Sequence, residues 1–236
     1  MLFSDLKTKL VNANIFGKLK KRKIKFITDH SKDANSSTLL IINNNKEFKR
    51  DYLKKAIDKG LEVIITNSYL NNVNITQIVV EDLDKEILNL LNFRQPFRPK
   101  KSIAITGTNG KTSVTWYLLQ ICKYNNIKTK LTGTLGFYKN NKKVKNSSLT
   151  TPSNLELYQF ANSNKKNSDV FISEASSHGL HQGRYSNIKI DIAAITNLSH
   201  DHLDYHKTFK SYVESKMLLF TKVLNKNGTA VINSRL

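Results

Sequence analysis

The chain has 236 residues, of which 39% are hydrophobic, so it is long enough to bury a core and is not a disordered protein. Its formal charge of +20 admits a nucleic-acid partner, but the excess is lysine spread along the whole chain, as in a lysine-biased genome. The single cysteine, Cys122, excludes an intramolecular disulfide, and no apolar run approaches the ~20 residues of a membrane span, so we expect a cytoplasmic protein.

Short β-like runs and helical stretches alternate over the first hundred residues. The runs are IKFIT (24–28), TLLII (38–42), EVIIT (62–66) and QIVV (77–80). Between the second and the third, FKRDYLKKAIDKG predicts a helix that ends at Gly60. Its predicted apolar face consists of Tyr52, Leu53, Ala56 and Ile57. This pattern predicts a small α/β domain over residues 1–95.

A linker is predicted at residues 96–101. Pro96 and Pro99 stand there among charged residues, and proline favours an extended backbone in the residue before it. We therefore place the second domain at residues 102–236.

The second domain repeats the strand–helix alternation. Its predicted strands are SIAIT (102–106), DVFISE (169–174), IKIDIAAIT (188–196) and TAVIN (229–233). The helix after the first strand has Val114, Leu118, Ile121 and Cys122 in phase, and we interpret Cys122 as a core residue. Further helices are predicted at 152–163, opened by a Ser153–Glu156 capping box, and at 208–224. Such alternation predicts an α/β fold with a mostly parallel, doubly wound sheet. Because the chain stops soon after a strand, we expect it to be a fragment.

The segment TGTNGKT (106–112) follows a strand and opens a helix, which is the context of a phosphate-binding loop. The standard pattern requires a glycine at the position of Ile105, so the glycine spacing here is short. Gly107 and Gly110 allow the backbone to approach phosphate oxygens closely. Lys111 is then expected to reach the β- and γ-phosphates, and Thr112 to offer its hydroxyl to Mg²⁺.

Two later segments are expected at the same edge of the sheet, because ligands of parallel sheets gather at the carboxyl ends of the strands. Glu174 closes one predicted strand, and NLSHDHLDYH (197–206) follows the next. Glu174 and His202 are candidate Mg²⁺ ligands, although this ion prefers oxygen over histidine nitrogen. A transition-metal site and a solvated loop are the alternatives, and spacing does not separate them.

Lys216 falls on the apolar stripe of the last predicted helix. The stripe consists of Phe209, Val213, Phe220 and Val223. A buried, unpaired ammonium is costly, so the side chain either extends to solvent or is paired or chemically altered inside. A lysine with a lowered pKa can react with carbon dioxide to form a carbamate, which exchanges a positive charge for a negative metal ligand.

The segments TGTNGKT, LTTP, EASSHGL…R and NLSHDHLDYH…YVESK, in this order over residues 102–218, resemble the Mur ligase family. Within the family they are similar to the members that add the third residue of the cell-wall peptide. The short glycine spacing of the loop is a feature of that family.

The resemblance implies roles for individual residues. The ATP-binding residues would be Gly107, Thr108, Asn109, Gly110, Lys111, Thr112 and Ser113. The substrate-binding residues would be Thr150, Thr151, Ser176, Gln182, Arg184 and, in the N-terminal domain, His30. The metal ligands would be Thr112, Glu174 and His202, and Lys216 would be carbamylated. At the uridine pocket the chain has Asp29-His30-Ser31, where relatives read Asp-Ser-Arg.

The implied reaction is ATP- and Mg²⁺-dependent. It joins a diamino acid to UDP-N-acetylmuramoyl-L-Ala-D-Glu (UDP-MurNAc-L-Ala-D-Glu) through an acyl phosphate. Family members carry a third, C-terminal domain that selects the amino acid, and we expect this chain to lack it. We therefore expect little turnover by the chain alone, favour meso-diaminopimelate over lysine as the commoner substrate, and expect a monomer.

Three alternatives stay open at this point. Another Mur ligase would share the loop, and so would a folylpolyglutamate synthetase, although the latter usually reads Gly-Lys-Gly where this chain has Lys111-Thr112. The third alternative is a basic nucleic-acid-binding fragment, whose affinity would fall steeply with salt.

Overall fold

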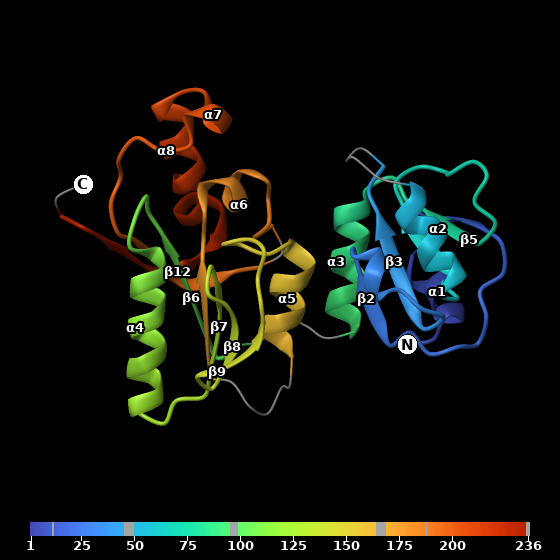
Figure 1. The fold of residues 1–236 in the computed structure, drawn as a ribbon, viewed down its shortest axis with the longest axis horizontal. Coiled ribbons are helices and arrows are strands. Elements are labelled where there is room, and N and C mark those ends of the chain that lie inside the picture. Colours follow the sequence, from blue (N-terminus) through green and yellow to red (C-terminus); the bar gives the residue numbers. More distant parts are fainter. Residues whose placement is uncertain (11, 45–49, 95–98, 164–168, 187, 235–236) are drawn as a thin grey trace. The chain divides into compact units, whose positions relative to one another are not determined.

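The computed structural model describes residues 1–10, 12–44, 50–94, 99–163, 169–186 and 188–234, which form two compact units, Met1–Pro96 and Phe97–Leu236 (Figure 1). Of the predicted linker, residues 96–98 lie outside the described residues, and Lys101 already belongs to a strand. None of the described helices combines the length and the apolar character needed to cross a membrane.

The N-terminal unit is a five-stranded sheet in the order β1-β5-β4-β3-β2. Strands β2 to β5 are parallel, and β1 joins the edge antiparallel to β5. The strands are β1 (Asn14–Phe16), β2 (Phe26–Thr28), β3 (Thr38–Ile42), β4 (Val63–Thr66) and β5 (Thr76–Val79). The helices are η1 (Phe3–Asp5), α1 (Leu6–Lys9), η2 (Ser31–Asp33), α2 (Arg50–Asp58) and α3 (Leu83–Arg94). All four predicted β-runs of this unit are confirmed as strands.

Helix α2 covers the sheet with a narrower face than the sequence predicts. Leu53 and Ala56 are buried in the core, and Ile57 packs against it. Tyr52 is 46% exposed, so its predicted core position is wrong. It lies about 100° around the helix from Leu53, at the rim of the buried face. Gly60 ends the helix as predicted, with the positive φ of +91° that suits glycine.

The second unit is a seven-stranded sheet in the order β12-β11-β6-β10-β7-β8-β9. Strands β12, β11, β6, β10 and β7 run parallel, whereas β8 and β9 extend the sheet as antiparallel neighbours. The strands are β6 (Lys101–Thr106), β7 (Thr129–Gly133), β8 (Gly136–Lys139), β9 (Lys142–Lys145), β10 (Val170–Glu174), β11 (Ile190–Ile195) and β12 (Leu224–Ile232). The predicted α/β class with a mostly parallel sheet is confirmed.

The helices of this unit are α4 (Lys111–Tyr124), α5 (Asn154–Asn162), α6 (Ser177–His181), α7 (Leu203–His206) and α8 (Phe209–Leu218), followed by the π-helical turn η3 (Leu219–Val223). Figure 1 shows the strands lying between α4 on one side and α5 on the other. Helix α5 begins as predicted, because the Ser153 hydroxyl accepts the Glu156 N–H at 3.3 Å.

Helix α4 packs on the sheet through Thr115, Leu119 and Cys122, which confirms Cys122 as a core residue. Leu118 packs at the margin of this cluster. Ile121 is 57% exposed, so its predicted inward position is wrong. With Thr115, Leu119 and Cys122 at the centre of the buried face, Ile121 lies about 120° around the helix from it.

The parallel register brings three strand ends to one edge of the sheet. Glu174 is level with Ile105 at the end of β6, and Ile195 at the end of β11 is level with Thr106. The segments that follow these strands therefore start side by side, at the edge where parallel sheets hold their ligands.

Candidate active site

The predicted phosphate loop connects β6 to the first turn of α4. Gly107 has φ +139° and Gly110 has φ +81°, both in the region that favours glycine. A Cβ on Gly107 would lie 1.8 Å from the Thr196 hydroxyl, so the loop passes too close to the end of β11 for a side chain. Thr196 in turn donates to Asn109 O at 2.6 Å, and Asn197 Oδ1 accepts the Asn109 N–H. Thr196 and Asn197, just after β11, thus fix the loop at Asn109, and the loop leads into the N-terminus of α4, where backbone N–H groups favour an anion.

Two lysines meet on one backbone oxygen of this loop. Lys111 donates to Gly107 O and Thr108 O, both at 2.8 Å, and Lys216 donates to the same Gly107 O at 2.7 Å. Burial, together with the neighbouring Lys111 ammonium, lowers the pKa of Lys216 to about 7. Burial also lowers the pKa of Lys111, against the attraction of Glu174 and Asp201. The predicted inward phase of Lys216 is confirmed, since its side chain is 1% exposed.

Tyr212 joins the phosphate loop to Lys216, a role that the sequence analysis missed. Its hydroxyl lies 2.8 Å from the Thr108 hydroxyl, and the Lys216 ammonium lies 4.5 Å from the centre of its ring. Thr108 also donates to Ser199 O and accepts the Ser199 N–H. Residue Thr108 of the loop is therefore held by both the 197–206 segment and α8.

Glu174 lies beside the phosphate loop with its carboxylate in a cage of donors. Thr112 donates to Oε2 at 2.9 Å. The N–H of Thr134 donates to Oε1 at 2.9 Å, and its hydroxyl donates to Oε2 at 3.1 Å. The side chain is buried, yet no lysine or arginine of the described residues is bonded to this carboxylate. Such a set of oxygen atoms fits Mg²⁺, which prefers carboxylate and hydroxyl ligands.

Gly133 makes room for this carboxylate, and we expect Gly133→Ala to displace it. A Cβ at position 133 would lie 2.1 Å from Glu174 Oε1 and 2.8 Å from its Cγ. The expected result is a loss of stability of about 1–3 kcal/mol, the usual cost of overpacking, in urea unfolding. Gly60→Ala is the comparison for backbone strain without a clash, because its Cβ would meet nothing closer than 3.9 Å and its cost comes from the positive φ of +91°. An alanine variant at 133 with wild-type stability would contradict this account.

His202 and His206 of the 197–206 segment form an aromatic cluster with α6. The ring of His178 lies 4.7 Å from that of His202 and 4.2 Å from that of Tyr205. Burial lowers the pKa of His178, and the nearby His202 lowers it further. Among the described residues, no group of three or more His, Cys, Asp or Glu side chains is arranged to hold a metal ion. His202 also lies 6.4 Å, ring to ring, from Tyr212, and it shares no hydrogen bond with Thr112 or Glu174 within the described part.

The predicted substrate residues of the second unit lie in one continuous network. Thr151 Oγ1 bonds to Glu174 O at 2.8 Å and lies 3.0 Å from the Ser176 hydroxyl, which caps α6. The Thr150 hydroxyl lies 3.2 Å from the Thr134 hydroxyl. Arg184 donates to Thr151 O and to Gln182 Oε1. The network thus extends from the Glu174 strand to Arg184.

His30 belongs to the N-terminal unit. Its N–H donates to the Thr28 hydroxyl at 3.0 Å, and its ring nitrogen Nε2 lies 3.8 Å from Asp29 Oδ1. Its predicted uridine contact stays a prediction.

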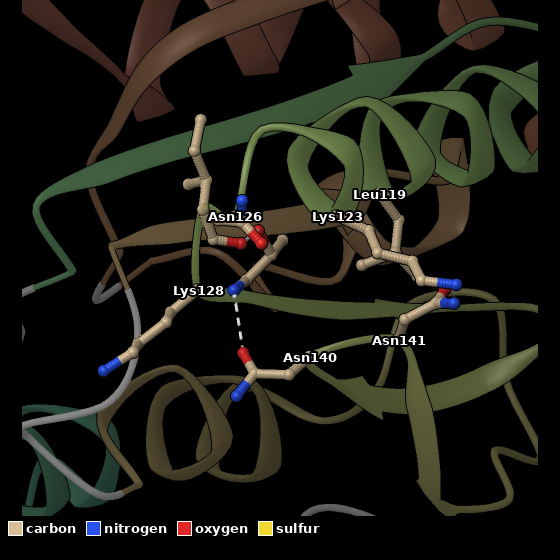
Figure 2. A pocket seen from close by; sticks show the side chains of 8 residues that line it. Leu119, Lys123, Asn126, Lys128, Asn140 and Asn141 are labelled. Atoms are coloured by element: carbon tan, nitrogen blue, oxygen red, sulfur yellow. Dashed lines mark hydrogen bonds between the residues drawn. The ribbon is translucent and has the colours of Figure 1, made fainter.

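A pocket with a volume of about 230 Å³ lies at the other end of α4, away from the phosphate loop. It is lined by Leu119, Lys123, Asn126, Ile127, Lys128, Thr129, Asn140 and Asn141. Figure 2 shows the bond from the Thr129 N–H to Asn140 Oδ1, at 3.1 Å, in its wall. Leu119 and Lys123 lie 8 and 12 residues beyond Lys111, so about 12–18 Å of helix separates this pocket from the phosphate loop. It is therefore not part of the candidate site.

Comparisons with known proteins agree on one family. The family model described as Mur ligase middle domain matches residues 105–235. The UDP-N-acetylmuramoyl-L-alanyl-D-glutamate–2,6-diaminopimelate ligase of Rickettsia bellii is 37% identical over 220 residues, which are 91% of this chain and 45% of that protein. The protein of the same name from Rickettsia prowazekii is 34% identical over 220 residues, which are 91% of this chain and 46% of that one.

Solved structures show the same relationship. A structure of a ligase with that name has a TM-score of 0.72 at 27% identity and covers 100% of this chain and 47% of its own. The MurF ligase of Acinetobacter baumannii has a TM-score of 0.70 at 19% identity, with 98% and 48% covered, and this shows the fold alone. The chain spans about half the length of the curated relatives it matches.

Proposed function

The chain belongs to the Mur ligase family, and we propose that it acts as part of an ATP-dependent amide ligase of peptidoglycan precursor synthesis. The substrate proposed is UDP-MurNAc-L-Ala-D-Glu, and the amino acid added is a diamino acid, with meso-diaminopimelate favoured by the names of the relatives. The observation that carries the proposal is the meeting of Lys111, Thr112, Glu174 and Lys216 around one glycine loop. The substrate carboxylate and the triphosphate repel each other, and the Lys111 ammonium together with a metal ion held by Thr112 and Glu174 would offset this repulsion.

The proposed reaction has two steps. A γ-carboxylate oxygen of the D-glutamyl residue attacks the γ-phosphorus of ATP, the bond to the β-phosphate oxygen breaks, and ADP leaves. The amino group of the diamino acid then attacks the acyl phosphate carbon, and phosphate departs as the amine loses a proton. The N–H groups at the start of α4 and the Lys111 ammonium stabilise the charge on the transferred phosphoryl group.

Mg²⁺ fits the oxygen atoms of Thr112 and Glu174, and His202 is the proposed ligand of a second ion. When bound, the metal would neutralise phosphate charge and so let the substrate carboxylate approach. Lys216 is the proposed carbamylated residue. Its buried amine has a pKa of about 7, so an unprotonated amine that can react with carbon dioxide is present at neutral pH.

Binding measurements on the 236-residue chain test the proposal. In isothermal titration calorimetry we expect saturable binding of an ATP analogue with Mg²⁺, and of UDP-MurNAc-L-Ala-D-Glu. UDP-MurNAc-L-Ala and a folate are the competing ligands, which distinguish another Mur ligase and a folate-type ligase. A gel-shift series in rising salt tests the nucleic-acid alternative. The proposal would be overturned if the chain bound neither the nucleotide nor the UDP-dipeptide.

A further inference from the structure

Tyr205 joins two parts of the site that are far apart in the sequence. It lies on α7, a single turn with left-handed residues at both ends, His202 at φ 52° and Lys207 at φ 65°. Helices α6 and α7 both pack against α8 (Figure 1). The centre of the Tyr205 ring lies 4.2 Å from that of His178 on α6, with the rings tilted by 37°, and the Tyr205 side chain is half-buried.

That hydroxyl reaches the loop that follows α6. Gln182 Nε2 donates to Tyr205 OH at 3.2 Å, and His181 Nδ1 lies 3.0 Å from the same oxygen. A glutamine amide has a donor end and an acceptor end. With its donor end on Tyr205, the amide must present its oxygen on the other side.

The side-chain amide oxygen of Gln182 accepts hydrogen bonds from Arg184. Both Nε and Nη2 of the guanidinium donate to Gln182 Oε1, while Nη1 donates to Thr151 O. Gly183, with φ +67°, makes the turn that brings the two side chains together. A guanidinium has five N–H groups, and three are used by these contacts. Within the described part of the chain this leaves one N–H on each terminal nitrogen, a fork that suits the two oxygens of an anionic group.

We propose that Tyr205 is a positioning residue for Arg184, the arginine proposed to bind the UDP-linked substrate. Its hydroxyl accepts from the Gln182 amide and so holds that side chain in place, and Gln182 in turn aims the Arg184 fork at an anionic group of the UDP-linked substrate. The inference rests on the proposed function and extends it to a residue that touches no substrate itself. It also places the 197–206 segment, which adjoins the phosphate loop, in contact with the substrate side of the site.

Tyr205→Phe tests this, because it removes one oxygen and keeps the ring contacts with His178 and His206. In calorimetric titrations of the 236-residue chain we expect its Kd for UDP-MurNAc-L-Ala-D-Glu to rise about three- to tenfold, as for one lost hydrogen bond. The Kd of the ATP analogue with Mg²⁺ should not change. Tyr124→Phe is the matched control, since Tyr124 is 88% exposed at the far end of α4.

A double-mutant cycle separates positioning from a general structural role. If Tyr205 acts through Gln182, then Tyr205→Phe should have no further effect on the Kd in a Gln182→Ala background. If the two substitutions raised the Kd by independent factors that multiply in the double variant, the inference would be overturned while the proposed function stands. A Tyr205→Phe variant with the wild-type Kd would have the same consequence. A wild-type chain that binds the nucleotide but not the UDP-dipeptide would remove the substrate proposal and this inference with it. Thermal unfolding of each variant checks that the fold is retained.

Discussion

Lys216→Met is expected to stabilise the isolated chain at neutral pH, although it removes a hydrogen bond. Lys216 is 1% exposed, and its pKa falls from 10.5 to about 7. A pKa that is lower in the folded chain means that folding disfavours the charged amine. The resulting cost to folding stability is reduced by relaxation of the site. We expect the free energy of unfolding at pH 7 to rise by about 1–3 kcal/mol, since methionine fills a similar volume without a charge.

The lowered pKa of Lys216 determines how the stability difference between the wild type and Lys216→Met changes with pH. Between about pH 7 and pH 10.5 the unfolded chain keeps a proton on Lys216 that the folded chain has released. Stability of the wild type therefore rises with pH over this window, and below pH 7 the full cost of the buried charge is present. Lys130, with a pKa lowered to about 8, adds a similar slope in both proteins. The difference between the two proteins should thus be largest at pH 6 and should shrink towards pH 10.

Urea unfolding in buffers purged of carbon dioxide measures this difference, because a carbamate would replace the ammonium by another charge. Lys123→Met is the control, since Lys123 lies at the far end of α4 and lines the surface pocket. For activity, in contrast to stability, the carbamate proposal predicts a loss when Lys216 is replaced. In a protein of the relatives' length, Lys216→Ala should abolish ligation, and short carboxylic acids should restore part of it. A Lys216→Met variant that is less stable at pH 6 than the wild type would contradict the buried-charge account.

The elements that carry the phosphate loop were predictable because their information is local. The strand SIAIT, the glycines and the apolar period of α4 follow one another within about twenty residues. The inward phase of Lys216 was predictable for the same reason, since helical periodicity fixes its face. Its partner, Gly107 O, lies 109 positions away in sequence, and no spacing rule reveals such a contact.

Strand β7 was not predicted, and with it Thr134 was missed. The strand reads TKLTG, so only Leu131 is apolar, yet all five residues are buried. The lysine is tolerated because it finds partners in another element, donating to Ala161 O and Ser163 O at the end of α5. The Thr129 hydroxyl bonds to Ile127 O nearby, and the buried Thr132 hydroxyl has no partner among the described residues. A strand whose burial depends on such distant partners carries no alternation of apolar and polar residues for a sequence to show.

Tyr205 and Tyr212 illustrate the same limit inside the site. Both stand in segments that the sequence marks as functional, next to His206 and Lys216. Their roles depend on which hydroxyl or amide meets them from another element, namely Gln182 for Tyr205 and Thr108 for Tyr212. The edge of the sheet was therefore predictable from topology, whereas the hydrogen bonds across it required coordinates.

Lys111→Ala is expected to weaken nucleotide binding more than any other single change in the loop. The ammonium bonds to Gly107 O and Thr108 O in the structure, at the centre of the loop, and these neutral acceptors can be exchanged for phosphate oxygens. A bond between an ammonium and a phosphate is charge-assisted and about twice as strong as a neutral one. Its loss should raise the Kd of an ATP analogue with Mg²⁺ about 10- to 100-fold.

The matched control for Lys111→Ala is Lys123→Ala on the same helix. Both variants lower the net charge by one, so a non-specific attraction of the nucleotide to a chain of charge +20 would weaken equally in both. A specific loop site predicts a large effect at position 111 and less than about a twofold effect at position 123. The effect at 111 should also persist in 0.5 M salt, because a site formed by backbone N–H groups and a half-buried ammonium is screened less than exposed lysines. Equal, salt-sensitive losses in the two variants would mean that the loop does not bind the nucleotide specifically, and the ligase proposal would lose its first substrate.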